Sequence, residues 1–479
     1  MSKRPELRRS AGRVMATVGL AVLAGALLLP EAAPAHGIVG KTDLPIPRWL
    51  FAWAAAVVLV VSFVALATLW PTPRLEQARE RLVGRFPRIL DPLSGAIGLA
   101  LFVVVVYAGF AGRPQATSNI APTFVFVIFW VGLAVLSLFT GDIFRALNPW
   151  RALARGTAWI AGRISRTGLP APMPYPPRWG RWPAVVMIAA YAWLELVYAN
   201  KDDPSTLSAL ALAYAAIQLI GMSVYGIETW STRADGFGVY FGLFARLAPW
   251  RWAEGCLYRR APVVGAATLD PLPGTAALLA VMIGSTSFDG FSVGSAWTSL
   301  EPHVQSVFSD LGAGREAALE LAYTVGLVGM IVVVGGLFAL GVAGMRSVGG
   351  GHRASELAAR FAHSLVPIAL AYVVAHYFSL LVFQGQAMGY LISDPLGDGS
   401  NIFGTGGWQI DYNAVASNAV WYVQVGALVL GHVAGLLLAH DRALVVYRRA
   451  SQATRSQYWM LAVMVGFTSL GLWILSSTT

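Results

Sequence analysis

The side chains best placed to do chemistry are two histidines that interrupt long apolar stretches. His376 and His432, two of the seven histidines in the chain, are flanked on both sides by mainly apolar residues. A titratable group inside a lipid bilayer costs a few kcal/mol, so by default it marks a substrate, ion or proton pathway. The alternative is an imidazole that hydrogen-bonds a neighbouring helix and serves only the packing.

Helix geometry places further polar residues beside these histidines. Tyr372 precedes His376 by one helical turn, which puts both side chains on the same face. Gln424 precedes His432 by two turns and lies about 80° around the helix, so these two line one broad face. We therefore add Tyr372 and Gln424 to the candidate pathway.

Three acids complete the candidate pathway: Asp289, Glu195 and Glu228. Glu195 and Glu228 lie near the ends of apolar stretches, whereas Asp289 belongs to the segment Gly284–Phe291, which interrupts another stretch. Such an interruption predicts one of two structures. The first is a broken or re-entrant helix of the kind that holds substrates in transporters, and the second is an ordinary helix end with a capped loop.

An outward-facing metal site is a separate hypothesis. Cleavage after Ala35 would make His36 the first residue, and an N-terminal histidine can chelate copper through its free amine and its ring. His303 is the other candidate ligand. Because Cys256 is the single cysteine, a multi-cysteine metal or iron–sulfur site is excluded.

Neither haem nor enzymatic catalysis is indicated. His363 and His376 are thirteen residues apart, which turns them to opposite faces of a helix, so they do not form a haem-ligand arrangement. The sequence has no P-loop and no His-Glu-x-x-His zinc motif. We therefore expect a protein that is not an enzyme.

The composition requires these residues to be positioned by membrane helices. The chain has 479 residues, 56% of them hydrophobic and only 12% charged, and its mean hydropathy is +0.61. A soluble domain carries about twice that share of charge, so an ordinary soluble protein is excluded. The sequence predicts an all-α, polytopic transmembrane helix bundle.

Apolar stretches long enough to cross a bilayer predict about ten spans and no soluble domain. They lie at residues 47–70, 92–112, 118–141, 181–200, 205–230, 271–288, 317–345, 355–385, 414–440 and 457–476. A basic segment, an apolar stretch and small residues up to Ala35 predict a signal peptide at 1–35, with an uncleaved first helix as the alternative. Residues 36–479 then form a single integral membrane domain.

The basic residues give this topology a direction. The net charge is +10, and 31 of the 34 basic residues are arginines; with the four of the signal region, 28 of these arginines fall on one side of the predicted spans. By the positive-inside rule that side is the cytoplasm. The mature N-terminus and the C-terminus are then extracytoplasmic, in a plasma membrane of bacterial type. The charge thus marks topology, and we expect no nucleic-acid partner.

Three function classes follow from these patterns. The first is a permease or transporter of a small solute or ion, with its polar site near the membrane midplane. The second is an extracytoplasmic copper or redox membrane protein that uses His36. The third is a non-catalytic subunit or assembly factor of a larger membrane complex. In each class the lipid bilayer is the first partner.

Overall fold

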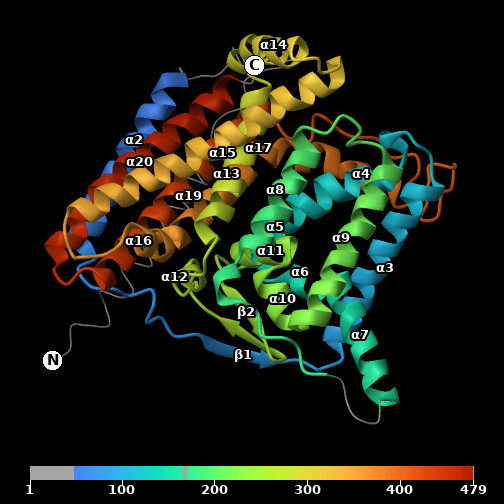
Figure 1. Cartoon of the computed structure of the whole chain (residues 1–479), viewed down its shortest axis with the longest axis horizontal. Helices are drawn as coiled ribbons and strands as arrows, with labels where there is room; N and C mark the ends of the chain where they lie inside the picture. The colour runs from blue at the N-terminus through green and yellow to red at the C-terminus, as the bar shows by residue number, and fades with distance from the viewer. Residues whose placement is uncertain (1–47, 166–169, 478–479) are drawn as a thin grey trace.

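Most of the chain folds into long helices packed side by side, as Figure 1 shows. The structure is a computed structural model that describes residues 48–165 and 170–477. The predicted signal peptide and His36 lie outside the described residues. The all-α prediction is confirmed, because within the described ranges only three short strands accompany the helices.

The longer helices form the bundle. They are α2 (Arg48–Leu69), α3 (Leu90–Ala111), α7 (Pro149–Ile164), α8 (Trp182–Leu196), α9 (Pro204–Tyr225), α11 (Gly236–Ala245), α13 (Thr275–Ser292), α14 (Ser295–Asp310), α15 (Arg315–Ser347), α17 (Val366–Phe383), α19 (Ser417–Val446) and α20 (Ala450–Ser477). One further span is composite: α4 (Ile120–Thr123) continues through the π-helix η3 (Phe124–Gly132) into α5 (Leu133–Thr140).

Shorter elements connect these helices. They are β1 (Arg81–Arg85), η2 (Ala116–Ser118), α6 (Ile143–Leu147), η4 (Pro177–Trp179), α10 (Ile227–Arg233), β2 (Trp250–Ala253), β3 (Cys256–Arg259), α12 (Val264–Ala267), α16 (Ala354–Phe361), η5 (Ala362–Leu365), η6 (Gln384–Ala387) and α18 (Met388–Leu391).

The chain is a multi-pass membrane protein, but the prediction of about ten spans is not confirmed. Seven helical segments in the described residues are long and apolar enough to cross a bilayer, and an eighth is added if α13 and α14 count as one bent span. Helix α8 falls short of that test. With 15 residues, α8 rises only about 22 Å, less than the thickness of a hydrocarbon core.

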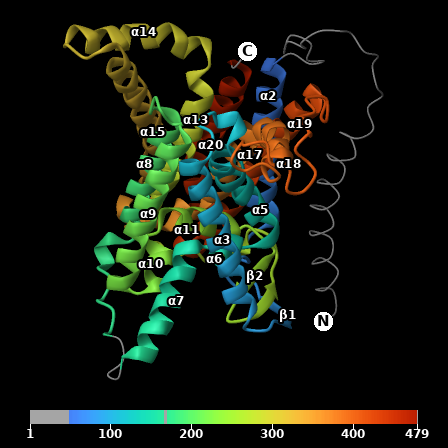
Figure 2. The ribbon, with the colours of Figure 1, turned by 90° about the vertical axis from the view of Figure 1, so that its right-hand side faces the viewer.

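The arginine-rich connections meet at one end of the bundle. Strand β3 pairs antiparallel with both β1 and β2, so the connections at 71–91 and 231–270 share one small sheet. Side-chain contacts join the other connections to them: Arg151 to Asp91 at 3.2 Å, Arg442 to Glu76 at 3.0 Å, and the Tyr447 hydroxyl to the Met345 carbonyl at 3.0 Å. Figure 2 shows β1, β2 and α7 at the end opposite α14.

The connection at 231–270 differs from the surface loop that the sequence suggests. It contains α11, whose side chains are almost all buried, including Phe237, Tyr240, Phe241 and Phe244. This helix packs against α5 and α8 inside the bundle. A run of ten residues without charge is too short to span a bilayer and is typical of a buried core helix.

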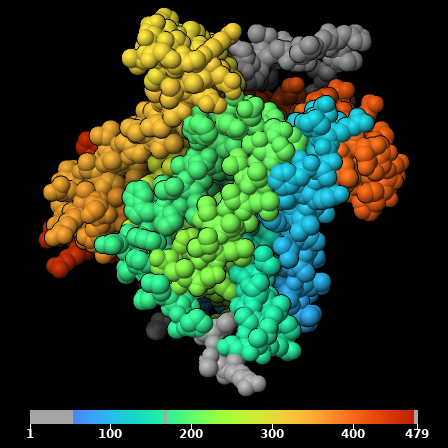
Figure 3. All heavy atoms as spheres, turned by 45° about the vertical axis from the view of Figure 1, so that its right-hand side comes forward, coloured from blue at the N-terminus to red at the C-terminus, as the bar shows by residue number. Residues whose placement is uncertain are grey.

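The interruption at Gly284–Phe291 is helical and does not break the sixth stretch. These residues lie within α13, and the chain bends by 93° only after Ser292, where α14 begins. Helix α14 then lies across the end of the bundle (Figure 2) and forms a projection in the space-filling view (Figure 3). Asp289 therefore lies in the last turn of α13, just before the bend.

Small residues bring α17 and α19 into close contact. A Cβ atom at Gly431 would lie 2.3 Å from the Ala371 Cβ, and one at Gly435 would lie 2.8 Å from the Ser364 carbonyl oxygen. Helices in membranes associate closely through such small residues, because lipid offers no hydrophobic driving force. The close packing positions the two helices that carry His376 and His432.

Candidate functional site

His376 and Asp289 form a hydrogen-bonded pair between two membrane helices. The Nε2 atom of His376 on α17 lies 2.9 Å from Oδ2 of Asp289 on α13. The side chains are 21% and 26% exposed, so the pair is neither sealed in the core nor open to bulk solvent. It joins a histidine and an acid that the sequence identified separately, and both partners can exchange a proton.

Further polar groups surround this pair. The Tyr377 hydroxyl is a hydrogen-bonding neighbour of Asp289. Glu195, at the end of α8, repels the Asp289 carboxylate, and Lys201 attracts it. The Lys201 Nζ atom donates to the Glu195 backbone carbonyl at 2.8 Å. Glu195, another sequence candidate, therefore belongs to the same polar cluster.

A small cavity adjoins the pair on the side of α19 and α20. Its volume is about 10 Å³, and Thr286, Ser287, Tyr372 and His376 contribute its polar lining. The Ser287 hydroxyl is buried and has no hydrogen-bond partner among the described residues. A cavity of about this size with several polar partners suits a single water molecule.

His432 lies beyond Tyr372, deeper in the bundle. The Tyr372 and His432 rings are 6.2 Å apart, and the Tyr372 hydroxyl donates to the Phe467 carbonyl at 2.8 Å. His432 is fully buried, its Nδ1 lies 2.7 Å from the Leu428 carbonyl, and its Nε2 has no partner in the described ranges. Gln424 is half-buried on the same helix, and no described hydrogen bond links it to the pair.

Glu228 lies apart from the other candidates, at the arginine-rich end. Its carboxylate accepts hydrogen bonds from Arg145 and Arg151, each at 2.8 Å. Burial alone would raise the pKa of Glu228, but the two guanidinium groups outweigh it and hold the pKa below its ordinary value. The structure thus brings His376, Asp289, Glu195 and Tyr372 together and separates Glu228 from them.

The most completely buried acid, Asp235, was missed by sequence reasoning. It has no exposed surface, and its carboxylate accepts from Trp150 Nε1 at 2.7 Å, Asn148 Nδ2 at 3.0 Å and the Tyr214 hydroxyl at 2.7 Å. From the sequence, its segment counts as a connection between spans, in contact with water. The apolar run of α11, which follows directly, was the signal that this segment enters the core.

A serine motif next to Asp289 lacks the expected structural context. Residues 290–294 read Gly-Phe-Ser-Val-Gly, the pattern of a hydrolase nucleophile elbow, which requires a strand-to-helix turn. Here the segment is the end of α13, and the Ser292 hydroxyl donates to the Asp289 backbone carbonyl at 2.8 Å. No described hydrogen bond joins Ser292 to His376, so these residues do not form a catalytic triad.

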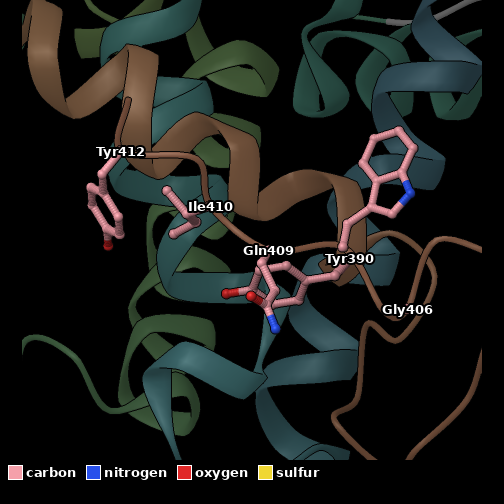
Figure 4. A pocket seen from close by; sticks show the side chains of 6 residues that line it. Tyr390, Gly406, Gln409, Ile410 and Tyr412 are labelled. Atoms are coloured by element: carbon pink, nitrogen blue, oxygen red, sulfur yellow. The ribbon is translucent and has the colours of Figure 1, made fainter. Parts of the chain in front are cut away.

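The end of the bundle that carries α14 has no developed metal site within the described residues. His303 is exposed on α14, and its Nδ1 lies 3.0 Å from the Ser299 carbonyl. No group of three or more His, Cys, Asp or Glu side chains suited to a metal occurs in the described part of the chain. A hollow of about 430 Å³ lies in the loop region after α18. Figure 4 shows the side chains that line it, among them Tyr390, Gln409, Ile410 and Tyr412. Because it is wide open, it does not enclose a small ligand.

Comparisons with known proteins add no relative: no family model, no curated protein and no solved structure matches this chain.

Proposed function

We propose that this protein is a permease or transporter of a small solute or ion, with the His376–Asp289 pair at its working site. The observation that carries the proposal is the pair itself: two titratable side chains, 2.9 Å apart, contributed by different membrane helices. Polar groups at membrane depth are costly, so a pair of this kind indicates a pathway. Its partial exposure supports access from one side of the bundle.

The proposal includes a topology of ten spans with the arginine-rich end in the cytoplasm of a bacterial-type cell. Two contacts support a crossing by the short helix α8. At its start the Arg181 amide donates to the Pro273 carbonyl at 2.7 Å, among the arginine-rich connections. Just beyond its end the Ala199 amide donates to Glu320 at 3.0 Å, at the opposite end. Both chain termini are then extracytoplasmic.

Cysteine labelling tests this topology. In a Cys256→Ser background, Ser309→Cys places a thiol on exposed α14 and Arg85→Cys places one on exposed β1. A membrane-impermeant maleimide applied to intact cells should label Ser309→Cys and leave Arg85→Cys unlabelled until the cells are opened. The reverse pattern would overturn the orientation.

Transport is tested with the purified protein in two steps. A panel of solutes and ions is screened for thermal stabilisation in detergent, since a ligand at a hundred times its Kd stabilises by about 2.7 kcal/mol. The stabilising compound is then measured for uptake into proteoliposomes. We expect Asp289→Asn and His376→Gln to lower the initial uptake rate at least about tenfold, a free-energy difference of about 1.4 kcal/mol.

Glu228→Gln is the matched control, because it makes the same change from acid to amide at the distant arginine-rich end. It should retain the wild-type uptake rate. Equal uptake by the wild type, Asp289→Asn and His376→Gln would remove the pair from the transport mechanism.

A further inference from the structure

The donor set at the pair is poorly suited to a metal cation. Asp289 is contacted by an imidazole nitrogen and by the Tyr377 hydroxyl. Hard cations take about six or more oxygen ligands, often from several carboxylates, and no group of three or more His, Cys, Asp or Glu suited to a metal occurs in the described residues. A proton needs only one lone pair, and both partners of the pair can carry it.

Few charged groups act on the pair. The groups that act on Asp289 or on its neighbour Glu195 come from α8, α11, α17 and the turn after α8, namely Glu195, Lys201, Tyr191, Tyr240 and Tyr377. Together with Asp289, this set contains one lysine, Lys201, and two carboxyl groups, those of Asp289 and Glu195. No arginine is among the groups that act on Asp289, in contrast to Glu228 at the other end, which two arginines hold; the basic groups beside Asp289 are His376 and Lys201.

The adjoining cavity has room for about one water molecule beside His376. A water molecule in it would contact His376 on one side and the hydroxyls of Ser287, Thr286 and Tyr372 on the others. The unpartnered Ser287 hydroxyl favours this occupant, because a buried water normally bonds to about three otherwise unsatisfied polar groups.

We propose that the ion bound at this site is a proton, shared between Asp289 and His376 and exchanged through a water molecule in the adjoining cavity. This rests on the proposed transport function and names its coupling ion. On binding, the proton forms a bond to an imidazole nitrogen or a carboxylate oxygen. On release, the same bond breaks, its electron pair remains on the side chain, and the water accepts the proton.

Infrared difference spectroscopy of the full-length protein in lipid tests this proposal directly. Spectra recorded between about pH 5 and pH 8, in which histidine ordinarily titrates, report both the carboxylic-acid C=O stretch and the imidazole ring bands. The proton is therefore seen whichever partner carries it. We expect a pH-dependent signal in the wild type that is lost in Asp289→Asn and His376→Gln.

Two further variants keep the test independent of folding defects. Asp289→Glu retains the carboxyl group and should retain a pH-dependent signal, whereas Glu228→Gln should leave the wild-type signal unchanged. Replacing sodium by potassium at constant pH should have no effect. A signal that follows sodium, or a pH-dependent signal that survives in both Asp289→Asn and His376→Gln, would overturn the proton assignment.

The outcomes separate this inference from the transport proposal. Pair-dependent solute uptake without a pair-dependent infrared signal overturns the proton and leaves the permease in place. A pair-dependent infrared signal without uptake of any solute or ion overturns the permease and leaves the proton site in place.

Discussion

Two carboxylates in this bundle, Asp235 and Asp289, are withdrawn from solvent in different ways. Asp235 is fully buried and accepts hydrogen bonds from an indole, an amide and a phenol, none of which changes charge near neutral pH. Asp289 is partly exposed and pairs with the imidazole of His376, a type of side chain that can change its charge near neutral pH. The first arrangement holds helices together, and the second is the one at which we propose that a proton is exchanged.

The neighbourhoods of the two acids reinforce this difference. Asp235 links α11 to the start of α7 and to α9, so its hydrogen bonds hold three helices together. Asp289 joins only α13 to α17, beside a cavity that can admit water. Burial alone therefore does not distinguish a candidate functional acid from a structural one in this bundle. The chemistry of the groups that bond to the acid distinguishes them better.

The largest expected effect is the loss of stability when Asp235 is removed. Asp235→Ala strips the acceptor from three buried donors, and each unsatisfied donor costs about 1–3 kcal/mol, so we expect at least about 3 kcal/mol of destabilisation. Asp289→Ala, at a partly exposed site with a neighbouring cavity, should cost less than half as much. Thermal unfolding of both variants in the same detergent measures the difference, and equal midpoints would contradict the comparison.

A smaller effect concerns the ion pairs of Glu228 with Arg145 and Arg151. The Glu228 side chain is 50% exposed, so we expect Glu228→Gln to cost about 1 kcal/mol or less at neutral pH. Because the folded-state pKa lies below the ordinary value of 4.5, this contribution is present above that pH. It is lost as the pH falls through the folded-state pKa.

Unfolding midpoints of the wild type and Glu228→Gln, measured across this pH range, test whether the stability contributed by Glu228 is lost on acidification. The difference between them should be constant above about pH 5 and should shrink on acidification. A difference that grows towards low pH would show that Glu228 is not held ionised by the two arginines.

The smallest effect is expected at the cavity. Ser287→Ala removes one hydroxyl from the lining, and the loss of one contact to a bridging water changes the free energy by about 1 kcal/mol or less. The initial uptake rate should therefore fall by no more than about fivefold, while the unfolding midpoint stays close to that of the wild type. A loss as complete as that of Asp289→Asn would instead give Ser287 a direct part in binding.

Residue type and hydropathy alone identified His376 and Asp289 as candidates, because a polar side chain in an apolar stretch stands out. Their pairing could not be predicted, since a single sequence does not show that α13 packs against α17. The grouping of the arginine-rich connections followed from the positive-inside pattern, and the contacts between them agree with it.

Other features depended on how segments pack. Asp235 was missed because α11 lies between arginine-rich stretches and was counted as part of a connection. The count of ten spans is unconfirmed because α8, with 15 residues, is too short to span a bilayer. The residues that flank its two ends nevertheless contact segments at opposite ends of the bundle. The segment Gly284–Phe291 remained helical despite its polar residues, because the Ser285 and Thr286 hydroxyls bond to the Met282 carbonyl one turn back.

The most direct test of the central claim compares the two acid-to-amide variants Asp289→Asn and Glu228→Gln in proteoliposomes, with initial uptake rates normalised to the amount of folded protein. The account predicts that Asp289→Asn loses at least about nine-tenths of the wild-type rate while Glu228→Gln retains it, a difference of about 1.4 kcal/mol. Equal rates in the two variants would contradict the assignment of the working site to the His376–Asp289 pair.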